Sequence, residues 1–186
     1  MILGLVSVLS GRGFQALIKV LIDTALAFPG LVLALLMTGV LGPSGSSLVI
    51  GLVLSGWAWW ARLSRSLLLT AQGREFVLSG RLVGVKGRRL FYYYLFPQIW
   101  PPLLIAASLR TGWTILAVSG LSYLGLGAQP PAPEWGIMLQ ESRLYLTRAP
   151  WLMVAPGAAI TLTVLSFILL AEGLRATFQI KKAVAL

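Results

Sequence analysis

The sequence contains no cysteine and no histidine among its 186 residues. Without cysteine there is no disulfide framework and no thiol nucleophile, and without histidine there is no Ser-His-Asp triad. The absence of both residue types also excludes zinc and haem sites built on Cys or His ligands. Only 5 residues are acidic, which leaves little material for carboxylate chemistry. The sequence therefore indicates no catalytic site and no metal site.

Charged residues are also scarce, at 11% of the chain, whereas 58% of the residues are hydrophobic and the mean hydropathy is +0.87. Soluble domains contain about 25% charged and about 45–50% apolar residues. This composition is typical of an integral membrane protein. A mass of 20.0 kDa fits one membrane domain over residues 1–186.

Four apolar stretches are long enough to cross a bilayer, which takes about 20 helical residues. They predict an all-α, polytopic transmembrane helical bundle, with spans at about 20–41, 48–70, 95–127 and 151–170. Asp23 and Pro29 interrupt the first stretch, and the third is too long for one straight span. Residues 1–10 are apolar but too short to cross alone, so we expect them to be the tail of an incomplete span.

The 15 basic residues are distributed unevenly between the apolar stretches. They concentrate in segments 11–19 and 62–90 and in the C-terminal tail, whereas segment 42–47 has no charge and segment 128–150 sums to zero. Cytoplasmic loops carry the excess of Lys and Arg. We therefore expect the three basic segments, including the C-terminus, to face the cytoplasm, and we interpret the charge excess as a topology signal rather than as a nucleic-acid surface.

The largest basic segment, at about 72–90, contains a short stretch with helical spacing. Phe76, Val77, Leu82 and Val83 can share one side of a helix, while the basic side chains stay in water. Gly84 then ends or bends that helix. From the residues alone two interpretations stay open: the helix lies on anionic headgroups, or it docks onto a soluble partner. Farther along, the stretch 135–146 predicts a short extracytoplasmic helix lying on the membrane.

Several motifs resemble one known family. Gly84, nine further residues and then Tyr94-Leu95-Phe96-Pro97 resemble the EAA loop of ATP-binding-cassette importer permeases. Its pattern is Glu-Ala-Ala, three residues, Gly, nine residues, hydrophobic-x-hydrophobic-Pro. The stretches DTALAFP at 23–29, WAWWARLSR at 57–65 and LSYLGLGAQPPAPEWG onward from 121 are similar to the peptide/opine/nickel branch. The likeness covers nearly the whole chain in the right order, with a slight lean towards nickel or metallophore members.

This resemblance implies the type I importer permease fold, here apparently lacking the N-terminal helix or helices. It also implies a bacterial inner-membrane subunit that forms a path with a second permease for a peptide, nickel or a metal chelate such as a metallophore or opine. Two separate ATPase subunits would bind ATP and Mg and drive transport. An extracytoplasmic solute-binding protein would deliver the solute, and this chain itself would hold no cofactor.

The resemblance further implies a coupling helix at 75–84 that contacts the ATPase. The residues assigned to coupling are Glu75, Phe76, Leu78, Ser79, Gly80, Arg81, Gly84 and Pro97. Where the loop pattern has Glu-Ala-Ala, this chain has Leu78-Ser79-Gly80. Small residues at 79 and 80 preserve close packing, and Glu75, one turn earlier, could partly replace the missing acid.

Arg110 lies inside the third apolar stretch, and a cation at bilayer depth costs about 2.5–3.5 kcal/mol on insertion scales. It could form a structural pair with Asp23 or with the partner chain, line the path and favour an anionic solute, or snorkel to the interface. Arg110 and Asp23 are therefore candidates for the translocation path.

Two alternative functions stay open from the sequence. A truncated remnant that does not transport is one, because family members have about six spans. An intramembrane hydrolase is the other, and the absence of His and Cys argues strongly against it.

Overall fold

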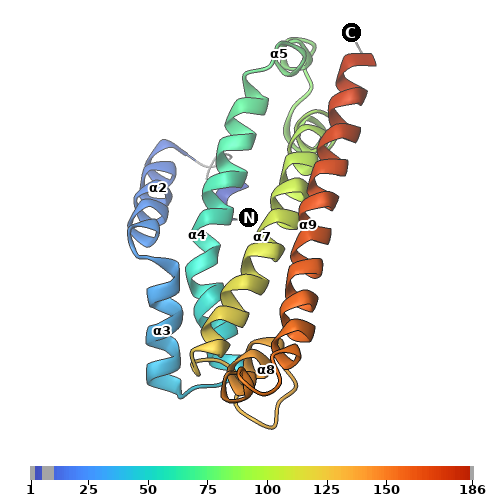
Figure 1. Cartoon of the computed structure of the whole chain (residues 1–186). Coiled ribbons are helices and arrows are strands. Elements are labelled where there is room, and N and C mark those ends of the chain that lie inside the picture. The colour runs from blue at the N-terminus through green and yellow to red at the C-terminus, as the bar shows by residue number, and fades with distance from the viewer. Residues whose placement is uncertain (1–2, 6–10, 185–186) are drawn as a thin grey trace. The chain divides into compact units, whose positions relative to one another are not determined.

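The computed structural model describes residues 3–5 and 11–184, which are helical segments joined by short connections with no strand among them (Figure 1). The all-α prediction is confirmed. Of the predicted tail at 1–10, residues 3–5 are helical and the others lie outside the described residues. The elements that follow are α2 (Arg12–Ala27), α3 (Gly30–Leu41), α4 (Gly45–Gln72), α5 (Glu75–Leu82), α6 (Gly87–Leu90), the π-helix η1 (Phe91–Leu95), α7 (Phe96–Tyr123), α8 (Trp135–Ser142), the 3-10 helix η2 (Arg143–Tyr145) and α9 (Trp151–Val184).

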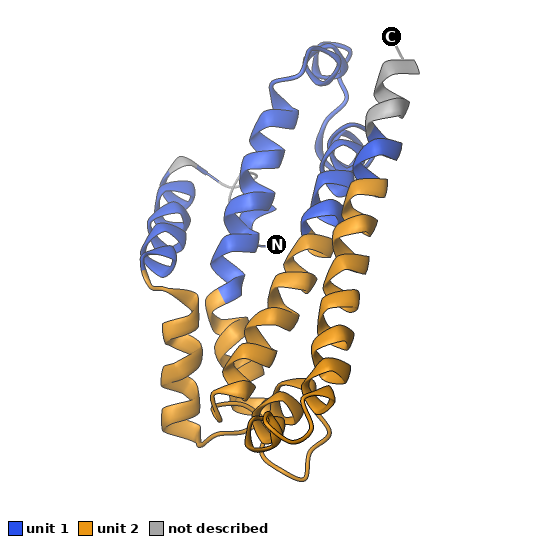
Figure 2. Ribbon diagram, in the orientation of Figure 1, with its two compact units in different colours: residues 1–27, 56–106, 174–186 blue, residues 28–55, 107–173 orange. Residues whose placement is uncertain are grey.

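The chain divides into two compact units, coloured separately in Figure 2. Unit 1 comprises residues 1–27, 56–106 and 174–186, and unit 2 comprises residues 28–55 and 107–173. The long helices α4, α7 and α9 each contribute residues to both units.

Two helical runs among the described residues, Gly87–Tyr123 and Trp151–Phe178, are long and apolar enough to cross a membrane. The pair α2 and α3 would supply a third crossing if it forms one broken span. Helix α4 covers the predicted span 48–70 but is not among these runs, so the four-span arrangement stays a prediction. Large apolar side chains on α9 are exposed, as for Leu169 at 70%, which suits a surface that faces lipid.

The first predicted span is two helices rather than one. Helix α2 ends at Ala27 and α3 begins at Gly30, with Pro29 as its N-cap residue. Proline disfavours helical geometry in the residue before it and has no N–H for the helix ladder. Phe28, directly before Pro29, is therefore outside α2, and Pro29 itself is extended, with φ −60° and ψ 122°, before α3 begins.

The third predicted span, by contrast, continues through its prolines. The helical run from Gly87 to Tyr123 changes to π geometry at Phe91–Leu95, directly before Pro97. The N–H of Phe96 donates to the Phe91 carbonyl, one residue farther back than in an α-helix. A proline removes a helical hydrogen bond and crowds the preceding turn, and a π-helical turn is one way to accommodate both effects.

Unit 1 has its largest buried cluster where α4, α5, α6, η1 and α7 meet. The cluster comprises Leu68, Ala71, Val77, Leu90, Leu95, Ile99 and Leu103. In unit 2, Ala34, Leu48 and Leu121 form a buried cluster. There the backbones of α3 and α4 approach so closely that a Cβ on Gly51 would lie 2.6 Å from the Ala34 Cα. Small residues permit such close helix packing in membrane proteins.

Candidate functional site

The candidate site is α5, an eight-residue helix that begins with Glu75 and follows Arg74 in extended conformation. The predicted helix at 75–84 is therefore two residues shorter in the structure. An acidic residue in the first turn and Arg81 in the last turn both complement the helix dipole.

Gly84 ends α5 through a Schellman motif. Its φ is +87°, a conformation that glycine adopts without the steric cost of a Cβ. The N–H of Gly84 donates to the Arg81 carbonyl at 3.0 Å, and the N–H of Val85 donates to the Gly80 carbonyl at 3.0 Å. These two bonds satisfy carbonyls that the end of a helix otherwise leaves unpaired. Gly84 thus ends the helix, as the sequence predicts.

One face of α5 packs onto η1 and α6. Val77 is fully buried in the cluster that contains Leu90 and Leu95. Gly80, one turn later, lies against Tyr94, where an added Cβ would be 2.9 Å from the ring Cε1 atom. Phe76 stacks on the same ring with centroids 6.4 Å apart. Arg74 donates from Nη1 to Gln98 Oε1 at 3.0 Å, which ties the start of α5 to α7.

The rest of α5 is exposed, and the four apolar residues predicted to share one side of the helix differ in burial. Phe76, Leu82 and Val83 are 40%, 88% and 79% exposed, and only Val77 is buried. The buried face is a narrow strip because it consists of Val77 and Gly80, which lie three residues apart and so on the same side of the helix. We call the exposed residues of α5 that follow Glu75 the docking face: Phe76, Leu78, Ser79, Arg81 and Leu82.

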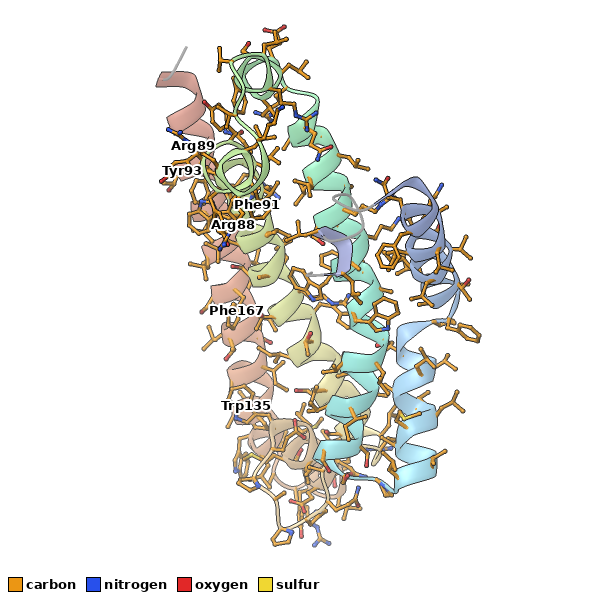
Figure 3. The ribbon with its side chains drawn as sticks, turned by 180° about the vertical axis from the view of Figure 1, so that it is seen from behind. Arg88, Arg89, Phe91, Tyr93, Trp135 and Phe167 are labelled. Carbon is orange, nitrogen blue, oxygen red and sulfur yellow. The ribbon has the colours of Figure 1, made fainter. Side chains whose placement is uncertain are left out.

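Basic residues precede, belong to and follow α5 along the chain. Figure 3 shows Arg88 and Arg89 beside Phe91 and Tyr93, where α6 continues into η1. All the basic residues of the segment are exposed: Arg74, Arg81, Lys86, Arg88 and Arg89. This segment therefore presents exposed apolar side chains together with five exposed cations.

The two candidates for the translocation path belong to different units. Arg110 lies half-buried on α7 in unit 2, with its Cζ atom 4.1 Å from the centre of the Trp113 ring. Asp23 lies exposed on α2 in unit 1, at a pocket that Lys19, Arg62 and Arg65 also line. The pairing of Arg110 with Asp23 stays a prediction.

The predicted helix at 135–146 is present as α8 followed by η2. Glu134 caps α8, because its Oε2 accepts a hydrogen bond from the Ile137 N–H at 3.1 Å. Arg143 lies over the Tyr123 ring at 5.3 Å, which connects the end of this segment to α7 within unit 2. Trp135 is labelled on this segment in Figure 3 and is 39% exposed. Its placement on the membrane surface stays a prediction.

Comparison with known proteins identifies the family. The chain matches the family described as "Binding-protein-dependent transport system inner membrane component" over residues 1–181. The chain belongs to this permease family.

Curated relatives agree with this assignment. The chain is 37% identical over 173 residues to the dipeptide transport system permease protein DppC of Alkalihalophilus pseudofirmus, a match that covers 93% of this chain and 57% of the relative. It is 40% identical over 172 residues to the nickel transport system permease protein NikC of Escherichia coli K12, covering 92% and 62%. It is 37% identical over 162 residues to the glutathione transport system permease protein GsiD of Shigella flexneri, covering 87% and 54%.

The family resemblance found in the sequence is thus confirmed, and so is the peptide and nickel branch. The family description and the apolar helical runs make this permease a multi-pass protein of the inner membrane. The chain spans 54–62% of the length of these three relatives. The names of these relatives give three different solutes, and the chain is nearly equally identical to all three relatives. The identities therefore favour none of the three solutes.

Two features of the site were missed by sequence reasoning. Tyr94 was assigned only to the loop motif, whereas its ring packs against both Phe76 and Gly80. The grouping of Lys19 with Arg62 and Arg65 was missed because they lie on separate helices. A signal for the first was available, because a glycine inside a short helix often marks the close approach of a bulky neighbour.

Proposed function

We propose that the chain is a permease subunit of an ATP-binding-cassette importer, with α5 as its contact to a cytoplasmic ATPase. The permease pairs with a second permease to form the path, and two separate ATPase subunits bind ATP and Mg. A solute-binding protein delivers the cargo from the other side. The solute is a peptide, nickel or a metal chelate, and the relatives' names support the peptide and the nickel. The permease itself is not an enzyme.

The observation that carries this proposal is the exposure of the docking face. Leu82 is 88% exposed and Leu78 is 46% exposed on a helix whose opposite side is fully buried. Exposed apolar side chains rimmed by polar and charged ones mark an interaction surface. The exposed cations of this segment favour a partner surface that carries carboxylates, which would steer the association.

The packing of α5 suits a helix that transmits motion. Val77, Gly80 and Phe76 fix α5 to η1, and Arg74 holds it to Gln98 at the start of α7. A displacement of α5 by the ATPase would therefore move the start of α7 with it. Alternating access in transporters is largely rigid-body movement of such helices. ATP-driven closure of the two ATPases would in this way open the path to each side in turn.

Contact between α5 and a cytoplasmic ATPase would also fix the orientation of the chain in the membrane. The docking face and the C-terminus are cytoplasmic, and α8 faces outward, where it meets the binding protein or gates the outer mouth. Arg110 and Asp23 are proposed to line the path, with Arg110 favouring anionic solutes because a positive charge raises the local concentration of anions.

Affinity purification of the tagged chain from its native membrane tests the proposal, with mass spectrometry of the proteins that accompany it. We expect a second permease and an ATPase in nearly stoichiometric amounts. A chain that is inserted in the membrane but purifies alone would overturn the proposal and would favour the non-transporting remnant. A purified chain with peptidase activity would favour the hydrolase instead.

A further inference from the structure

We propose that unit 1 contains a binding site for a phosphate group, supplied by an anionic phospholipid, between α2 and α4. A pocket of about 180 Å³ lies between these helices. Lys19, Ile22 and Asp23 line it from α2, and Arg62, Arg65, Ser66 and Leu69 line it from α4.

The pocket follows from how the two helices pack. Ile18 and Ile22 of α2 pack against Ala58 and Ala61 of α4, and these four residues form a buried cluster. The small alanine side chains let the two backbones approach. On α4, the residues that line the pocket are 62, 65, 66 and 69. They share one face of the helix and follow the contact residues Ala58 and Ala61 along the chain. On α2 they recur at 19, 22 and 23, so one polar strip of each helix borders the same space.

The charges in this pocket favour an anion. Three cations, Lys19, Arg62 and Arg65, share it with the one carboxylate of Asp23, which gives a net charge of +2. Like charges held in one pocket repel each other, and a bound anion removes that repulsion. The Nε atom of Arg65 is buried and has no hydrogen-bond partner among the described residues. A buried donor of this kind needs an acceptor, and arginine is well suited to phosphate because its donors form a planar fork.

The surface beside the pocket favours a lipid as the source of the phosphate. Helix α2 carries exposed apolar side chains close to Lys19: Leu17 is 66%, Val20 63% and Leu21 52% exposed. A helix with basic residues next to an exposed apolar surface is typical of the membrane interface. Both basic segments that form the pocket are expected on the cytoplasmic side. Basic pockets between helices on that side bind anionic headgroups, and the acyl chains would lie along the apolar residues of α2.

Native mass spectrometry of the purified protein tests this site, using nanodiscs with equal amounts of phosphatidylglycerol and phosphatidylcholine. We expect the wild type to retain phosphatidylglycerol in preference to phosphatidylcholine. The double variant Arg62→Gln/Arg65→Gln should lose about tenfold or more in phosphatidylglycerol retention, because hydrogen bonds to charged groups are among the stronger polar contacts. The matched control is Arg88→Gln/Arg89→Gln, which removes the same charge from exposed positions and should retain the lipid.

Each outcome decides the proposal. Equal loss in both double variants would show a general attraction to positive charge and would overturn the site, as would equal retention in both. If the Arg62→Gln/Arg65→Gln variant fails to insert, Lys19→Gln removes a single exposed cation from the other helix and must still lower retention. Inorganic phosphate added at millimolar concentration distinguishes a lipid headgroup from free phosphate as the ligand. Failure to displace the lipid supports the headgroup, and full displacement would identify free phosphate as the occupant instead.

Discussion

The backbone of Gly80 lies against the ring of Tyr94, so closely that a Cβ atom at position 80 would come within 2.9 Å of the Tyr94 Cε1 atom. Contacts below about 3 Å between carbon atoms are repulsive, since the optimum is about 3.5–4.0 Å. Together with the burial of Val77, this contact fixes how α5 lies on η1. The residue at 80 thus determines whether the docking face is held in place.

A larger side chain at position 80 should therefore detach α5 from η1. We expect Gly80→Val to cost about 1–3 kcal/mol of local packing, the usual cost of overpacking. Limited trypsin digestion of inside-out vesicles measures this, because detachment should speed cleavage at Arg81. Ser79→Val, at the exposed neighbouring position, is the control and should leave the rate unchanged. Equal rates in Gly80→Val and wild type would contradict the packing described here.

The end of α5 should depend on glycine at position 84. Gly84→Ala places a Cβ at a φ of +87°, which costs about 1–2 kcal/mol in the left-handed region. We expect the altered helix end to lower solute uptake per ATP hydrolysed in proteoliposomes that contain the whole complex. Gly73→Ala is the matched control, because position 73 has no positive φ and its nearest neighbouring atom would be 3.7 Å away. Normal coupling in Gly84→Ala would argue against the coupling role of α5.

The role of Gly84 can be predicted from the sequence, whereas the role of Gly80 cannot, and the difference has a physical reason. Gly84 follows a helical pattern directly, so its role as a helix end depends only on local backbone geometry. The role of Gly80 depends on Tyr94, fourteen residues later in the printed sequence, and on a π-helical turn that places the ring. Local patterns predict which segments are helical. They do not predict which narrow face of a short helix is buried, so the burial of Val77 and the exposure of Leu82 and Val83 emerged only from the fold.

Packing within unit 2 should depend on Gly51. A Cβ there would lie 2.6 Å from the Cα of Ala34 and 3.2 Å from the Cβ of Met37. We expect Gly51→Leu to separate α3 from α4 and to lower the temperature at which the detergent-solubilised protein aggregates on heating. Gly39→Leu, where no atom lies within 4 Å of the added Cβ, should have little effect. An equal loss in both variants would mean that leucine itself, rather than close packing, is responsible.

Arg110 should affect transport more than assembly. Its guanidinium lies over Trp113, a cation–π contact worth about 0.5–2 kcal/mol, and Arg110→Ala removes both the contact and the charge. We expect reduced uptake of an anionic solute, with normal recovery of the partner subunits. Arg110→Lys keeps the charge and should preserve most of the uptake. Loss of the partner subunits in Arg110→Ala would favour a structural pair instead of a path residue.

The distribution of charge was easier to predict than its local grouping. The alternation of basic and neutral segments follows from the order of residues, because the charges are counted along the chain. The pocket around Arg65 requires the contact of Ile22 with α4. The order of residues along the chain shows neither where α2 contacts α4 nor which side chains border that contact. The pocket therefore emerged only from the fold.

Site-directed crosslinking at Leu82 tests the central claim most directly, and it needs no background substitutions because the chain has no cysteine. Leu82→Cys places a reactive thiol on the docking face, and Leu144→Cys places one on η2 at a position 83% exposed, close to the 88% of Leu82. In the purified complex, treated with a short thiol-to-amine crosslinker, we expect Leu82→Cys to join the ATPase and Leu144→Cys not to. Crosslinking to the ATPase from Leu144→Cys, or its absence from Leu82→Cys in a complex that still contains the ATPase, would contradict the assignment of α5 as the coupling helix.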